Sequence, residues 1–201
     1  MNYVLPGMGA SKKMYADGWL QLEGYTFLDW PEDFEGLTLP GLAAHIIDQH
    51  SIQPADAIVG TSLGGMIACE IANQIASDKI VLISSAVRSA EVSRVLEIIH
   101  PLIDFTPLEF LKRVAMNVPS ELAQLFVDAD AELVRRMCRA IFEWEGYNSE
   151  SKLFRIHGRG DHVIPLPEDV NCVVDGGHLI SVTHARECAE ATQGFLSAAC
   201  S

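Results

Sequence analysis

Short apolar runs typical of β-strands alternate with longer runs of helical periodicity along most of this chain. Apolar residues at helical spacing lie near residues 42–47, 66–71 and 179–196. Six shorter runs predict strands: Tyr3–Leu5, Thr26–Leu28, Ala57–Val59, Ile80–Ile83, Leu153–Ile156 and Cys172–Val174. Such alternation requires crossover connections, which make successive strands parallel and cover both faces of the sheet with helices. We therefore predict an α/β fold with a six-stranded, mainly parallel sheet.

Residues 88–150 interrupt this alternation, because their apolar residues have only helical spacing. Residues 106–109 begin one helix there with a capping box and a proline at its first position. We predict a single domain over residues 1–201, with a small helical cap inserted at about residues 89–150. Its apolar residues could line an acyl pocket, although helical spacing fits additional core helices equally well. These residues are Ile98, Ile99, Leu102, Ile103, Phe105, Phe110 and Leu111.

Composition excludes several classes of function. The chain has 201 residues, of which 49% are hydrophobic, so it can bury one substantial core. The formal net charge of -13 repels nucleic acid and anionic membrane surfaces, and we expect neither as a partner. No apolar run approaches the roughly 18 residues of a membrane span, and no signal peptide precedes the first strand, which favours a cytoplasmic protein. The sequence predicts no particular oligomeric state.

The sequence Gly60-Thr61-Ser62-Leu63-Gly64 matches the pattern G-x-S-x-G between a predicted strand and a predicted helix. Glycines on both sides permit a sharp strand-to-helix turn, which would expose the Ser62 hydroxyl beyond the carboxyl end of the strand. The same turn places Ser62 at a helix N-terminus, where free N–H groups favour developing negative charge. This context predicts a nucleophilic serine, in preference to a glycine-rich turn that only packs or binds an anion.

A serine nucleophile needs a histidine base that is oriented by a carboxylate. His178 follows the last predicted strand and precedes the C-terminal helix, so it belongs at the same edge of the sheet as Ser62. Asp161 follows the preceding strand after a glycine turn. Two other aspartates compete with it: Asp175 lies only three residues before His178, and Asp169 precedes the last strand at its opposite end. We therefore predict a triad of Ser62, His178 and Asp161.

Four segments resemble the α/β-hydrolase family, and together they extend over essentially the whole chain: "YVLPGMGAS", "AIVGTSLGGMIACEIA", "LFRIHGRGDHVIP" and "VVDGGHLISVTHA". The order Ser62, Asp161, His178 is the order of that family. The resemblance implies an oxyanion hole formed by the backbone N–H groups of Met8 and Leu63. It also implies a trimmed sheet, because the first predicted strand matches the third strand of the family.

The sequence departs from the family at Pro6 and Thr61, where many members have histidine, but neither position belongs to the triad.

A rival interpretation comes from "HGRGDH", because His157, Asp161 and His162 occupy three positions of the metal-binding pattern H-x-H-x-D-H. Arg159 stands where the second histidine should be, and a cation at a ligand position argues against a metal. The five cysteines are scattered without metal-ligand spacing, so we interpret them as reduced thiols.

Two hypotheses for function follow. The first is a serine hydrolase that cleaves a small or medium ester or thioester through an acyl-enzyme on Ser62, without a cofactor or metal. The second is a non-hydrolytic protein of the same fold, acting as a ligand receptor, lyase or acyltransferase. Fold alone does not decide between them, because function depends on the site.

Overall fold

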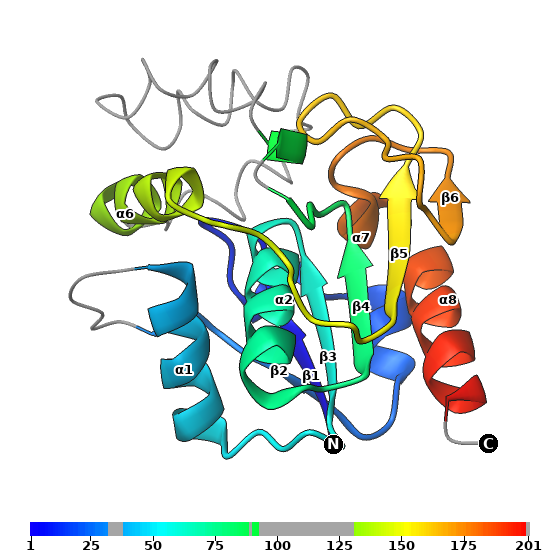
Figure 1. Cartoon of the computed structure of the whole chain (residues 1–201). Coiled ribbons are helices and arrows are strands. Elements are labelled where there is room, and N and C mark those ends of the chain that lie inside the picture. Colours follow the sequence, from blue (N-terminus) through cyan, green and yellow to red (C-terminus); the bar gives the residue numbers. More distant parts are fainter. Residues whose placement is uncertain (32–37, 89, 93–130, 200–201) are drawn as a thin grey trace.

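The computed structural model describes residues 1–31, 38–88, 90–92 and 131–199. Within these ranges the chain forms one six-stranded sheet with the order β2-β1-β3-β4-β5-β6 (Figure 1). The strands are β1 (Asn2–Leu5), β2 (Tyr25–Phe27), β3 (Ala57–Thr61), β4 (Lys79–Ile83), β5 (Leu153–Gly158) and β6 (Cys172–Val174). All neighbouring strands are parallel, which confirms the predicted α/β fold with a six-stranded sheet and all six predicted strands.

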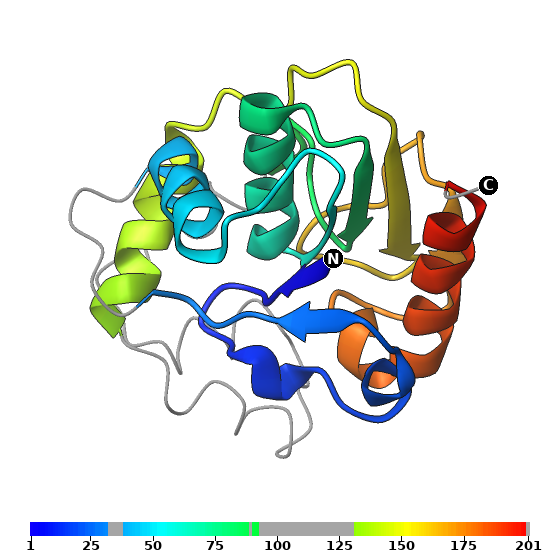
Figure 2. The ribbon, with the colours of Figure 1, turned by 90° about the horizontal axis from the view of Figure 1, so that it is seen from below.

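Helices cover both faces of the sheet (Figure 2). One face carries α1 (Leu39–His50), α2 (Leu63–Ile75) and α6 (Ala131–Phe142). The opposite face carries the 3-10 helices η1 (Lys12–Met14) and η2 (Asp17–Gln21), together with α7 (Ile180–Thr183) and α8 (Ala185–Ala198). A sheet covered in this way needs apolar side chains on both of its faces, which explains the continuous apolar runs in the central strands.

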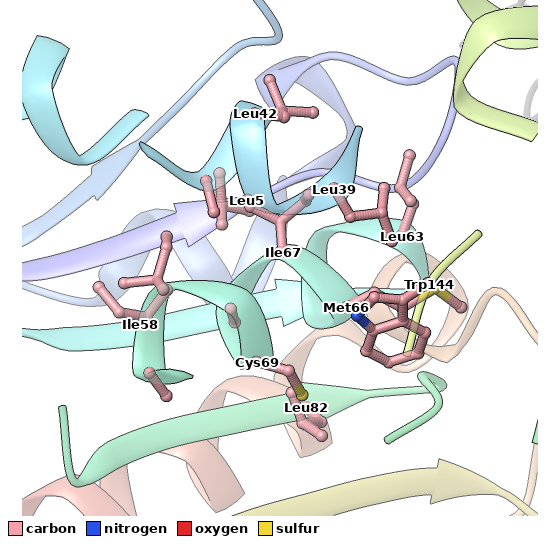
Figure 3. Close-up of a cluster of buried hydrophobic side chains, with 14 of the residues drawn as sticks. Leu5, Leu39, Leu42, Ile58, Leu63, Met66, Ile67, Cys69, Leu82 and Trp144 are labelled. Atoms are coloured by element: carbon pink, nitrogen blue, oxygen red, sulfur yellow. The ribbon is translucent and has the colours of Figure 1, made fainter. Parts of the chain in front are cut away.

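Alternate residues of the central strands belong to two separate cores. In β3, Ile58 packs on the α1 and α2 side, whereas Val59 packs on the α8 side. Figure 3 shows the first core, where Leu39 of α1 lies close to Leu63 and Ile67 of α2. Helix α2 is buried without interruption from Leu63 to Ala72, so it is the central helix of this layer.

The C-terminal helical region differs from the prediction of one continuous helix over residues 179–196. It is divided into α7 and α8 at His184, whose backbone angles of φ -127° and ψ 40° are not helical. The imidazole of His184 lies against Gly176, where an added Cβ would come within 2.8 Å of its Cε1 atom. It is also 2.9 Å from the hydroxyl of Thr183. The helix is therefore interrupted where His184 packs against the loop after β6. Apolar periodicity in the sequence does not predict this interruption.

Helix α6 confirms helical structure in one part of residues 88–150, where the sequence has only helical spacing. The other helices predicted within residues 93–130, and the seven candidate pocket residues between 98 and 111, lie outside the described residues. The single domain with a helical cap therefore stays a prediction.

Three observations concern the described residues as a group. Their cysteines, Cys69, Cys138, Cys172 and Cys188, are free thiols. Across the ranges given above, no helix combines the length and apolar character needed to cross a membrane. No cluster of three or more His, Cys, Asp or Glu side chains that could hold a metal ion is present in that part of the chain.

Candidate active site

The predicted site residues all lie shortly after strands β1, β3, β5 and β6. In a parallel sheet the carboxyl ends of the strands lie at one edge, so the segments that follow them meet there. The strand order reverses between β1 and β3, because β2 lies on one side of β1 and every later strand lies on the other. Ligand sites of open α/β sheets form at such a reversal, and here Met8 follows β1 and Ser62 follows β3.

Ser62 occupies the turn between β3 and α2 in an unusual backbone conformation, with φ 54° and ψ -118°. Such a conformation costs a non-glycine residue about 1–3 kcal/mol, so the surroundings must hold it in place. The Ser62 N–H donates to the carbonyl of Ile83 at 2.9 Å. The Ser62 carbonyl accepts from the Ser85 hydroxyl at 2.7 Å and also from the N–H groups of Gly65 and Met66. The end of β4 therefore anchors the strained turn.

The glycines around Ser62 serve close packing, whereas the positive φ belongs to the serine itself. A Cβ at Gly60 would lie 2.2 Å from the carbonyl carbon of Gly64. A Cβ at Gly64 would lie 2.5 Å from the carbonyl oxygen of Pro6, in the loop after β1. The prediction of a sharp strand-to-helix turn is confirmed, but its physical basis differs from the one expected: glycine lets neighbouring backbones approach, while the serine carries the strain.

The structure brings Ser62, His178 and Asp161 together in one chain of hydrogen bonds. Nε2 of His178 lies 3.0 Å from Oγ of Ser62. Nδ1 of His178 lies 2.9 Å from Oδ2 of Asp161. An ionised carboxylate can only accept, so the imidazole proton is on Nδ1 and Nε2 is free to accept from the serine hydroxyl. This is the arrangement in which histidine can act as a general base toward serine.

Asp161 is fully buried and its carboxylate accepts hydrogen bonds from several directions. Oδ1 accepts from the backbone N–H groups of Val163 and Ile164, both at 2.9 Å. Burial acts to raise the pKa of Asp161, but hydrogen bonds from His157 and His178 outweigh it, and the pKa lies well below its ordinary range. The carboxylate therefore stays ionised beside His178.

His157 is a buried neighbour of Asp161, and the sequence pattern around it predicts no role beyond the rejected metal site. Its Nε2 atom lies 2.8 Å from the carbonyl of Ile164 and 3.3 Å from Oδ2 of Asp161. Because both partners are acceptors, Nε2 carries the proton and is shared between them. The position of His157 at the end of β5, four residues before Asp161, is the signal that could have indicated this contact.

The two aspartates that compete with Asp161 for the triad, Asp169 and Asp175, have other partners in the structure. Asp175 has an exposed side chain and lies 3.8 Å from Arg159. Asp169 and Glu91 both bind the buried guanidinium of Arg155, each at 2.7 Å. Neither aspartate pairs with His178 in the structure.

The metal-binding interpretation also lacks geometric support. His162 is exposed, whereas His157 and Asp161 are buried and contact each other directly. Arg159, which replaces the second histidine of that pattern, has a largely exposed side chain.

The two predicted oxyanion donors follow neighbouring strands, β1 and β3. Leu63 is the first residue of α2, and Met8 belongs to the loop after β1. The N–H groups of Met8 and Leu63 donate to no other group within the described ranges. A Cβ built at Gly7 would lie 3.8 Å from Cβ of Ser62, so the Met8 loop lies beside the serine.

Tyr15 connects the last residues of β1 and β3. Its hydroxyl lies 2.6 Å from the carbonyl of Leu5 and 2.9 Å from the hydroxyl of Thr61. The side chain of Thr61, which stands where many family members have histidine, is thus buried and hydrogen-bonded to Tyr15.

Comparison with protein families places the chain in a known group. The model of the alpha/beta hydrolase family matches residues 3–191, which is most of the chain. The chain belongs to this family. A comparison with curated protein sequences finds no match.

Solved structures share the fold at low sequence identity. An esterase from Exiguobacterium antarcticum is 19% identical with a TM-score of 0.72, covering 98% of this chain and 92% of that one. An enol-lactonase from Burkholderia xenovorans LB400 is 18% identical with a TM-score of 0.70, covering 98% and 91%. A bromoperoxidase from Bacillus anthracis is 18% identical with a TM-score of 0.74, also covering 98% and 91%. Their differing names show that this fold supports several activities.

Proposed function

We propose that this protein is a serine hydrolase that cleaves a small or medium ester or thioester through an acyl-enzyme on Ser62. The observation that carries the proposal is the chain of hydrogen bonds from Ser62 Oγ through His178 to Asp161, at 3.0 Å and 2.9 Å. The family supports it, and the esterase and lactonase names among the structural neighbours agree with an ester-type substrate.

In the acylation half of the reaction, Oγ of Ser62 attacks the substrate carbonyl carbon while Nε2 of His178 takes the hydroxyl proton. The carbonyl oxygen becomes an oxyanion, for which the N–H groups of Met8 and Leu63 are the proposed donors. When the tetrahedral intermediate collapses, the bond to the leaving alcohol or thiol breaks. His178 returns its proton to that leaving group, and the acyl group stays on Ser62.

In the deacylation half, water attacks the acyl carbon and His178 takes its proton. Collapse of the second intermediate breaks the bond to Oγ, and His178 reprotonates Ser62. Asp161 holds the imidazole in the Nδ1–H form throughout and stabilises the imidazolium that forms twice per cycle. Its low pKa supports this role, because a carboxylate that stays charged is the partner that an imidazolium needs.

Labelling with a fluorophosphonate probe tests the proposal, because the probe forms a covalent bond only with an activated serine. The wild-type protein should be labelled stoichiometrically and should hydrolyse members of a panel of nitrophenyl esters and acyl-thioesters of increasing acyl length. The His178→Ala variant should lose most of both activities.

The exposed neighbour His162 provides a matched control. His162→Ala should retain labelling and hydrolysis, because this side chain lies on the surface. A folded wild-type protein that neither reacts with the probe nor hydrolyses any ester would contradict the proposal and favour the non-hydrolytic alternative.

A further inference from the structure

The carbonyl oxygen of Gly7 accepts two hydrogen bonds in the loop after β1. The indole Nε1–H of Trp30 donates to it at 3.0 Å, and the N–H of Ala10 donates at 3.2 Å. Trp30 follows β2, the strand that pairs with β1 on the side away from β3. Its half-buried ring packs against the core on the α1 and α2 face. The indole therefore connects the loop after β1 with the segment after β2.

These two bonds determine the orientation of the Met8 N–H group. The Gly7–Met8 peptide is trans, and in a planar trans peptide the carbonyl and the N–H point in opposite directions. A donor that holds the Gly7 oxygen on one side thus turns the Met8 N–H to the other side. Rotation of this peptide would require both bonds to the Gly7 oxygen to break.

The contact of Met8 with another described residue involves its side chain and not its N–H. The sulfur of Met8 lies 3.6 Å from the thiol of Cys138 on α6, so its side chain packs against that helix. The Met8 N–H itself donates to no described residue. Gly7 lies against Ser62, as the close approach of a Cβ built at Gly7 indicates. Among the described residues, the Met8 N–H is thus a donor without an acceptor, and it lies beside the proposed nucleophile in a fixed orientation.

We propose that Trp30 is a positioning residue for the oxyanion hole, acting through the Gly7–Met8 peptide. This inference rests on the proposed serine hydrolase function and on Met8 as an oxyanion donor. An oxyanion hole is effective because its donors are oriented before charge develops. If the peptide rotated, the Gly7 oxygen would replace the Met8 N–H and repel the developing negative charge. The indole bond disfavours that state.

A purely structural role for Trp30 makes a different prediction. Loss of core packing would lower thermal stability but would leave the properties of each folded molecule unchanged. Loss of the orienting bond would weaken the enzyme only toward species that carry an oxyanion. A trifluoromethyl ketone is such a probe, because the serine hydroxyl adds to its carbonyl and forms a stable tetrahedral oxyanion.

The test compares Trp30→Phe with Tyr3→Phe. The first variant keeps an aromatic ring and loses the N–H donor. The second loses a hydroxyl that donates to the carbonyl of His50 at 3.2 Å, near the amino end of β1 and far from the carboxyl edge.

The quantities to measure are kcat and KM for a nitrophenyl ester and the inhibition constant of the ketone. The concentration of active enzyme is determined by titration with the fluorophosphonate. Trp30→Phe should lower kcat and weaken ketone binding by about tenfold each, with little change in KM, because an orienting group contributes less than a direct donor. Tyr3→Phe should match the wild type.

Incorporation of the benzothienyl analogue of tryptophan at position 30 provides a second variant, since it keeps the bicyclic ring and replaces the N–H with sulfur. It should reproduce both losses even if Trp30→Phe does not fold. Wild-type kcat and ketone affinity in this analogue would overturn the inference while leaving the hydrolase proposal intact. A wild-type protein that is inert toward both the ester and the fluorophosphonate would instead overturn the hydrolase proposal itself, together with the role of Trp30.

Discussion

Nε2 of His157 lies 3.3 Å from Oδ2 of Asp161, the same carboxylate oxygen that accepts from His178. The two imidazoles approach this oxygen from β5 and from the loop after β6, so the carboxylate is held between them. His157 also binds the carbonyl of Ile164, whose own N–H donates to Asp161. The loop after β5 is thereby closed on itself around the aspartate.

Replacing His157 should therefore affect both activity and stability. We expect His157→Phe to lower turnover by about tenfold, since Asp161 loses one of the contacts that orient it. Unfolding free energy should fall by about 1–3 kcal/mol, because the buried Ile164 carbonyl loses its partner. His157→Gln keeps a side-chain N–H donor and should recover part of both losses. If His157→Phe had the kcat and the denaturation midpoint of the wild type, the contacts of His157 with Asp161 and Ile164 would contribute neither to activity nor to stability.

The strained backbone of Ser62 predicts different stabilities for two variants that should both be inactive. Ser62→Ala and Ser62→Gly should both abolish hydrolysis and fluorophosphonate labelling, because each lacks the hydroxyl. Glycine adopts φ 54° without the penalty of a Cβ, so Ser62→Gly should be more stable than Ser62→Ala by about 1 kcal/mol. Chemical denaturation measures this difference. Persistent labelling of either variant would place the nucleophile elsewhere, and equal stability would argue against strain at this residue.

Replacing Asp161 tests which carboxylate completes the triad. Asp161→Asn should lower turnover by up to about 10⁴-fold, the scale found when a triad aspartate is made neutral. Asp175→Asn removes a carboxylate from an exposed side chain three residues before His178, and it should keep most of the activity. The two variants carry the same chemical change, so steady-state kinetics with thermal unfolding compares them directly. An active Asp161→Asn beside a folded, inactive Asp175→Asn would reverse the assignment.

The low pKa of Asp161 also predicts how stability depends on pH. A carboxyl group whose folded-state pKa lies below its unfolded value stabilises the fold fully above the unfolded pKa, which is about 3.9 for aspartate. This contribution is lost as the pH falls through the folded-state pKa. The difference in unfolding free energy between the wild type and Asp161→Asn should therefore be constant above about pH 5 and shrink below about pH 4. Denaturant titrations from pH 7 to pH 3 measure it, and a difference that stays constant to pH 3 would contradict a lowered pKa.

Much of this architecture follows from local patterns in the sequence. The apolar runs at residues 57–59 and 80–83 alternate with runs of helical spacing, and this alternation favours a parallel sheet with helices on both faces. The spacing around Ser62, and the placement of Asp161 and His178 directly after strands, predicts that all three meet at one edge. The hydrogen-bonded distances between them agree with that prediction.

Tertiary structure alone decided other features, because they depend on which segments become neighbours. Only the order of the sheet shows that the segment after β2 lies beside the loop after β1, where the Trp30 indole can reach the Gly7 carbonyl. His157 becomes a partner of Asp161 only after the loop after β5 folds back on itself. Glycine at position 64 is explained by the approach of Pro6, which is 58 positions earlier in the chain. Periodicity and turn chemistry report how each segment behaves by itself, whereas contacts between distant loops arise only when the sheet holds their ends together.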